Sequence, residues 1–394
     1  MSPAYAARFA LSTTVTFLLL GATACAPQPS VVVAATPAPP SQSTTTTATT
    51  AIDSSRSTRE PVISRTPRTF NGWRVDAREH VDLWMHGFGI LLDDPSLVPS
   101  FAPGYRATMS KLRTGARSSL DADRDRLLKR MGENPNIASA QFLAFYFASW
   151  DDLKRGTDRF LRDRGDVREA RNEDELRMYA TLRTYFPTSE DRDWLQLFVS
   201  SLDDERGKFY RAYWLQQGQQ RAAVRGRVEQ LWNGTYQAAF GRFMRSSMQK
   251  DGYVLLSFPL GGEGRTIAVG RRDNFVAVPF PNSIEAANEA FFVAAHEVVG
   301  ATANSAVRDN ASAAEQRSGD AGKWQTLAAV RGGAMLLARI APDLLDGYMR
   351  YYLKLARVPE VQGDPAARFS ATFPLADRIR DALQVEIDAV LGGI

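Results

Sequence analysis

Cysteine and histidine are both scarce in this chain. Among 394 residues there is one cysteine, Cys25, and there are three histidines, His80, His86 and His296. A single cysteine excludes an intramolecular disulfide and any zinc site built from several thiolates. A metal bound by this chain alone must therefore be held by histidines and carboxylates.

The chain also lacks a long block of charge of one sign. Its 48 basic and 44 acidic residues give a net charge of +4, and they are interleaved in stretches such as "DADRDRLLKR". Mixed charges of this kind usually form solvated helix faces, and neither a basic stripe nor a nucleic-acid recognition module is present. We therefore expect no nucleic-acid partner. With 44% hydrophobic residues the composition is globular, with enough apolar side chains for one large or two ordinary cores.

The N-terminus has the pattern of an export signal. It reads "MSPAYAARFALSTTVTFLLLGATAC", with a positive charge at Arg8, an apolar run and then small residues. The apolar run is too short for a lasting membrane span. The pattern predicts a signal peptide over residues 1–24 and a protein located outside the cytoplasm.

Two interpretations of the cleavage site remain open. The stretch "GATAC" resembles the lipobox of bacterial lipoproteins, in which Cys25 would become the lipidated first residue, although Ala22 stands where leucine is usual. Ala22 and Ala24 also fit the A-x-A rule of ordinary signal cleavage. We favour lipidation because the only cysteine occupies the position that this chemistry needs. The resemblance implies a lipid anchor on a membrane of the bacterial cell envelope.

Residues 25–69 are rich in Pro, Ser, Thr and Ala and contain few large apolar side chains. Such a segment cannot bury enough surface to offset its ordering entropy, so it is predicted to be a disordered tether. Its r.m.s. reach would be on the order of 35 Å.

The remainder predicts a mainly α-helical fold, with a helical region over residues 70–250 and a second region over 251–394 that together form one domain or two. The first helix is expected in "DAREHVDLWMHGFGILLDDP", with Asp76 and Glu79 forming a capping box at its start. A long helical stretch is expected from Asp191 to Met248. Three β-rich runs follow, which we interpret as a small antiparallel β-meander; they are Tyr253–Phe258, Arg265–Val269 and Phe275–Phe280.

Further helices are expected after the meander. Asn282 and Glu285 form a potential capping box for the first of them. The expected ranges are Ile284–Val307, Ala321–Ile340, Asp343–Ala356 and Leu375–Leu391. Gly332 and Gly333 lower helix propensity inside the second, so we predict a close helix crossing there.

The helix after the meander carries the most suggestive motif. It contains "FFVAAHEVVGATANS", residues 291–305, with His296 and Glu297 adjacent. The order of a β-meander, a helix with a His-Glu pair and further helices resembles the zincin metallopeptidases, especially the gluzincin branch. In that family the HExxH pattern supplies two zinc ligands and a general base. The resemblance implies a zinc-dependent peptidase in which His296 is a ligand and Glu297 the base.

The motif is incomplete because Gly300 stands where the second histidine would be. A catalytic zinc generally has three protein ligands and one open position, so two more ligands are needed. Candidates are Asp309 and Glu315 beyond the helix, or one of His80 and His86. These two histidines are six residues apart, about 240° around a helix, so both cannot easily bind one ion.

Each of these residues also has a simpler interpretation. His80 and His86 are expected to be partly buried and hydrogen-bonded to carboxylates such as Glu79 or Asp82. Gly300 is expected either to open a pocket or to admit a close backbone. The alternative to a degenerate or rebuilt peptidase site is a non-catalytic envelope lipoprotein. In it the His-Glu pair is structural, and the helical surface binds a peptide, an envelope protein or a peptidoglycan-associated partner.

Overall fold

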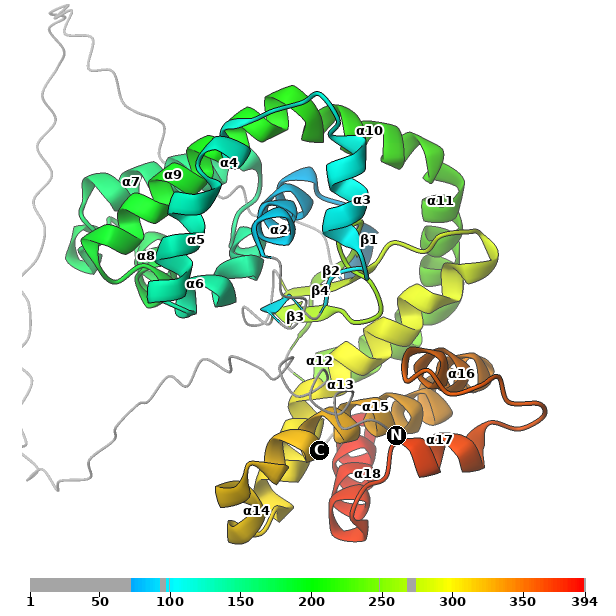
Figure 1. Ribbon diagram of the computed structural model, residues 1–394. Helices are drawn as coiled ribbons and strands as arrows, with labels where there is room; N and C mark the ends of the chain where they lie inside the picture. The colour runs from blue at the N-terminus through cyan, green and yellow to red at the C-terminus, as the bar shows by residue number, and fades with distance from the viewer. Residues whose placement is uncertain (1–71, 93–96, 99, 248, 268–273, 393–394) are drawn as a thin grey trace, which may run out of the picture. The chain divides into compact units, whose positions relative to one another are not determined.

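A computed structural model describes residues 72–92, 97–98, 100–247, 249–267 and 274–392 (Figure 1). All of these residues belong to one compact unit. Cys25, the predicted signal peptide and the predicted tether lie outside the described residues. Among the residues that are described, no helix is both long and apolar enough to cross a membrane.

The fold is mainly α-helical, as predicted. Before residue 250 the helices are α2 (Glu79–Leu91), α3 (Tyr105–Leu112), α4 (Ser119–Ala122), α5 (Arg124–Glu133), α6 (Asn136–Ser139), α7 (Trp150–Arg162), α8 (Glu173–Tyr185), α9 (Ser189–Glu205), α10 (Arg211–Gln220), α11 (Ala222–Leu231) and α12 (Gln237–Ser246). After the strands come α13 (Glu289–Asn310), α14 (Ala313–Ser318), α15 (Asp320–Ile340), α16 (Leu345–Leu355), α17 (Ala366–Thr372) and α18 (Asp377–Gly392).

The strands form a mixed sheet, so the predicted antiparallel meander is wrong. The strands are β1 (Trp73–Asp76), β2 (Gly252–Ser257), β3 (Arg265–Ile267) and β4 (Asn274–Pro279), in the order β1-β2-β4-β3. β2 is parallel to β1 and to β4, and only the edge strand β3 is antiparallel to its neighbour β4. β1 lies in a region that we expected to be helical.

The reason for the parallel pairing is visible in the two central strands. β2 and β4 are apolar almost throughout and buried along nearly their whole length. Strands buried on both faces are typical of parallel pairs covered by helices. Gly252 allows β1 to approach, because a Cβ there would lie 2.5 Å from the Asn274 carbonyl oxygen and 2.8 Å from the Trp73 ring.

The sheet separates two hydrophobic clusters. Alternate residues of β2 point to opposite faces, so that Val254 and Leu256 join one cluster while Tyr253 and Leu255 join the other. Helices from α2 to α9 pack in the cluster of Tyr253. The cluster of Val254 is formed by α11, α12, α13, α15, α16, α17 and α18. In Figure 1 the first group runs from blue to green, and the second runs from green at α11 to red at α18.

The helical stretch over residues 189–246 contributes to both clusters. It contains two π-helical turns, Arg206–Tyr210 between α9 and α10, and Trp232–Tyr236 between α11 and α12. Tyr210 is buried in one cluster and Trp232 in the other. The indole nitrogen of Trp232 also donates to the carbonyl of Trp73, so the second turn holds β1 in the sheet.

Two predicted helix caps are wrong. Asp76 ends β1 and accepts hydrogen bonds from Ala77 and Arg78. The cap position is Arg78, so α2 begins two residues later than a cap at Asp76 would require. Before α13 the capping residue is Ser283, whose hydroxyl accepts from the Ala286 amide, and a 3₁₀ turn Glu285–Asn288 leads into the helix.

The predicted close crossing at Gly332 and Gly333 is confirmed. A Cβ at Gly332 would lie 3.1 Å from a methyl group of Val299 on α13. A Cβ at Gly333 would lie 2.2 Å from the hydroxyl oxygen of Tyr348 on α16. The two glycines thus let α15 pack closely against both neighbouring helices.

Candidate functional site

Glu297 is on α13, and its side chain packs against the edge strand β3. A Cβ at Gly264 would be 2.9 Å from Cγ of Glu297, so glycine makes room for this side chain. Burial raises the pKa of Glu297 to about 7, although Arg265 and hydrogen bonds from Thr266 and Gly264 act in the opposite direction. Its carboxyl group therefore joins a helix to a strand in a largely dry environment.

His296 is packed against an aromatic ring. Its imidazole stacks on Tyr352 with the ring centroids 5.3 Å apart, and its Nε2 lies 4.0 Å from Oε1 of Glu297. The side chain is 12% exposed, and burial lowers its pKa to about 4. Within the described residues, neither Nδ1 of His296 nor the hydroxyl of Tyr352 has a hydrogen-bond partner. The imidazole is therefore neutral near pH 7.

The other two predicted ligands, Asp309 and Glu315, form hydrogen bonds and ion pairs with serine and arginine side chains. Asp309 accepts from the Ser305 hydroxyl and pairs with Arg308 at 3.0 Å. Glu315 caps α14 by accepting from Ser312 and forms an ion pair with Arg378. Bonding to Arg308 lowers the pKa of Asp309, and bonding to Arg378 lowers that of Glu315 to about 2.

These residues do not fit a zinc ion. Across the part of the chain that is described, no group of three or more His, Cys, Asp or Glu side chains could hold a metal. The structure thus does not bring His296, Asp309 and Glu315 together as one ligand set. At Gly300, where a second histidine would stand, a Cβ would meet nothing within 4 Å, so of the two alternatives expected there the close backbone is excluded.

His80 and His86 are buried in the core rather than partly buried as expected, and neither is bonded to Glu79 or Asp82. A ring nitrogen of His80 lies 3.0 Å from the Phe147 carbonyl oxygen, and burial lowers the pKa of His80 to about 4. Glu79, one of the expected partners, instead pairs with Arg206 at 2.8 Å.

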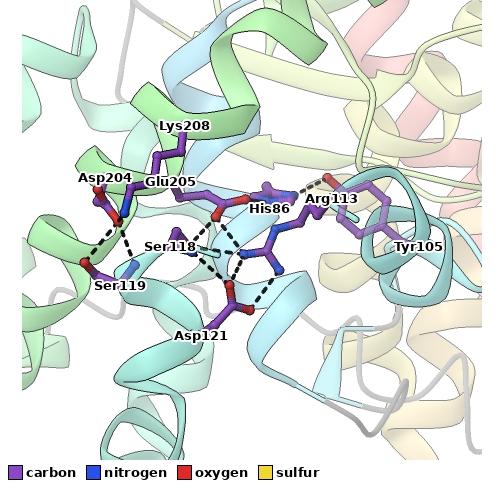
Figure 2. Close-up of polar contacts among 9 residues, drawn as sticks. All are labelled: His86, Tyr105, Arg113, Ser118, Ser119, Asp121, Asp204, Glu205 and Lys208. Carbon is purple, nitrogen blue, oxygen red and sulfur yellow. Dashed lines mark hydrogen bonds and ion pairs between the residues drawn. The ribbon is translucent and has the colours of Figure 1, made fainter. Parts of the chain in front are cut away.

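His86 belongs to a buried polar cluster that sequence reasoning missed (Figure 2). Nε2 of His86 lies 3.1 Å from Oε1 of Glu205, and Nδ1 lies 3.0 Å from the Tyr105 hydroxyl. Oε2 of Glu205 accepts from Arg113 at 2.7 Å and from the Ser118 hydroxyl at 2.5 Å. Since a carboxylate only accepts, we assign the imidazole proton to Nε2, and Nδ1 then accepts from Tyr105.

Electrostatics keep this cluster in one charge state. Burial alone would raise the pKa of Glu205, but the hydrogen bonds from His86, Arg113 and Ser118 outweigh it and lower the pKa to about 2. Burial lowers the pKa of His86, which remains neutral. Glu205 and Arg113 therefore form an ion pair beside a neutral imidazole whose orientation is fixed.

The cluster connects helices and is closed to substrates. The side chains of His86 and Glu205 are both 0% exposed. Its members come from α2, α3, α9 and the loop between α3 and α4, and the partners His86 and Glu205 are 119 positions apart in the sequence. No local pattern connects such positions, and for this reason the sequence did not reveal the cluster.

A groove with a volume of about 450 Å³ opens to solvent between α7 and α9, and two of its lining residues, Asp203 and Asp204, directly precede Glu205 on α9. It is lined by Lys154, Thr157, Asp158, Leu161, Gln196, Val199, Ser200, Asp203 and Asp204. Lys154 and Asp203 form an ion pair across it at 3.1 Å.

Comparisons of this chain with protein-family models, with curated proteins and with solved structures returned no match.

Proposed function

We propose that this protein is an exported, lipid-anchored module of the cell envelope that binds a partner and does not hydrolyse peptides. The observation that carries the proposal is the environment of His296. Its imidazole is stacked on Tyr352, and Glu297 is the only carboxylate paired with it among the described residues. A catalytic zinc needs more ligands than this pair supplies.

In this proposal the likeness to zincins is limited to the order of strands followed by a His-Glu helix, because the sheet is mixed and is not an antiparallel meander. The His-Glu helix follows the strands, and Glu297 packs on the edge strand β3, so the pair joins helix to sheet. The groove between α7 and α9 supplies a concave surface of the helical region at which a peptide or an envelope protein can be bound.

Metal analysis of the purified full chain tests the non-catalytic role. We expect less than 0.1 equivalent of zinc per chain as an order of magnitude, because two ligands of a three-ligand site are missing. His296→Phe should keep the free energy of unfolding within about 1 kcal/mol of wild type or raise it, since it removes an unpaired buried nitrogen while keeping a ring against Tyr352.

Glu297→Gln is the matched variant, because it keeps the shape of the side chain that packs on β3. One equivalent of zinc in the wild type, lost in His296→Phe and retained in Glu297→Gln, would establish a metal site and contradict the non-catalytic proposal.

The proposed anchor is tested separately with Cys25→Ser. We expect this variant to move from the membrane fraction to the soluble fraction, because a serine cannot carry the thioether-linked lipid. Ser41→Ala, in the predicted tether, should leave the partition unchanged. The anchor is refuted if the wild-type protein is already soluble after cell fractionation.

A further inference from the structure

Asp82 is a buried carboxyl group at the junction of three segments. It lies on α2 and is 1% exposed. Its Oδ1 accepts from the Ser257 hydroxyl at 2.7 Å, and its Oδ2 accepts from the Trp214 indole at 2.9 Å and the Phe258 amide at 3.3 Å. Asp82 therefore joins α2 to the end of β2 and to α10 through neutral donors.

The groups that face Asp82 from neighbouring elements are also neutral. They are the hydroxyls of Tyr105 on α3, Tyr210 in the π-helical turn and Tyr213 on α10. Burial raises the pKa of each tyrosine, so none of them ionises near neutral pH.

Charged groups on the same helix have partners elsewhere. Glu79 pairs with Arg206, and His86 is bonded to Glu205. Arg78 lies over the Tyr253 ring and pairs with Asp76. In the described part of the chain no cation pairs with Asp82, so an ionised Asp82 would be a buried charge without a counterion.

The segment that covers Asp82 is weakly held. α10 has no fully buried residue, and Leu215 on it is 50% exposed. Its Trp214 contacts Phe258 edge-on with the ring centroids 6.2 Å apart, and the indole donates to Asp82. Arg221, just beyond α10, donates to the Phe280 carbonyl. A segment with so little buried surface can open without unfolding the rest of the protein.

We propose that α10 is a lid over Asp82, and that loss of the Asp82 proton loosens this lid so that water reaches the carboxylate. Burial raises the pKa of Asp82 to about 7, which places the transition near neutral pH. A carboxyl whose pKa is higher in the closed state stabilises that state at low pH, and this stabilisation is lost as pH rises through 7. The lid is therefore closed in acid and loosened in mild alkali.

Hydrogen exchange of the full chain, measured by mass spectrometry on peptides within residues 211–220, tests the lid. After correction for the intrinsic pH dependence of exchange, we expect opening of α10 to be about tenfold more favourable at pH 8.5 than at pH 6. Asp82→Asn cannot ionise, so exchange of the same peptides should become independent of pH. Equal corrected exchange at the two pH values in wild type would overturn the proposal, as would a pH effect that persists in Asp82→Asn.

Two further variants separate the lid from general effects. Trp214→Phe removes the bond from the lid while leaving the charge of Asp82 unchanged, so it should raise α10 exchange at both pH values even if Asp82→Asn does not fold. Asp203→Asn is the matched control, because Asp203 also accepts from an indole, that of Trp150, but its side chain is 44% exposed. The pH effect should survive in Asp203→Asn, and its loss there would contradict the assignment to Asp82.

Discussion

Glu205→Ala is expected to lower the free energy of unfolding by about 3–5 kcal/mol. The glutamate is fully buried and accepts hydrogen bonds from His86, Arg113 and Ser118. Its removal leaves an arginine that is only 7% exposed without this partner, and leaves the Nε2 proton of His86 unsatisfied. Chemical denaturation at pH 7 measures the loss directly.

Two further variants serve as controls for the Glu205→Ala measurement. Glu205→Gln keeps an acceptor for His86 but removes the charge opposite Arg113, so its destabilisation should be smaller than that of alanine. Asp193→Ala changes an exposed carboxylate on the same helix and should alter stability by less than about 0.5 kcal/mol. A loss below about 1 kcal/mol in Glu205→Ala would show that the cluster does not stabilise the helical region as inferred.

Gly333→Ala is expected to destabilise the protein by about 3 kcal/mol, at the upper end of what overpacking costs. The new methyl carbon would lie 2.2 Å from the Tyr348 hydroxyl oxygen and 2.7 Å from Cζ of the same ring. Tyr348 is fully buried and donates to the Val330 carbonyl at 2.7 Å, so the ring cannot move aside without losing this bond. Thermal unfolding of the purified variant checks the prediction.

Gly300→Ala is the matched control for a glycine inside a helix. A Cβ at this position meets nothing within 4 Å, so only helix propensity changes. Alanine should therefore raise the free energy of unfolding by roughly 0.5–1 kcal/mol. Opposite signs at Gly333 and Gly300 are required; destabilisation of similar size at both positions would rule out the crossing as its cause.

The strands show how far local patterns predict this fold. The β-rich runs at residues 253–258, 265–269 and 275–280 were found to within a few residues, because their composition differs sharply from the helices around them. Their pairing was not predicted, because turn-forming residues between the strands are compatible with an antiparallel hairpin as well as with the parallel pairing of β2 and β4. β1 pairs with a strand far along the chain. The bond from the Gly72 amide to Asp251, at the start of this pairing, joins residues 179 positions apart.

The His-Glu pair shows a similar division. Its place on a long helix after the strands followed from apolar periodicity, and the missing second histidine was readable at Gly300. The ring of Tyr352 on His296 and the contact of Glu297 with Gly264 were not readable, because both partners belong to other elements. In the fold, Asp309 pairs with Arg308 and Glu315 pairs with Arg378. Sequence spacing alone does not distinguish a carboxylate in an ion pair from one that binds a metal.

The amino-acid sequence by itself determined the mainly helical class, the positions of β2, β3 and β4 and the glycine crossing on α15, because these depend on side-chain period and backbone freedom over a few residues. Only the tertiary structure decided that the sheet is mixed, that His86 meets Glu205, and that Asp82 is buried without a counterion beneath α10. These features depend on which residues, far apart in the sequence, come into contact when the two hydrophobic clusters form. Local sequence patterns contain no information about such contacts.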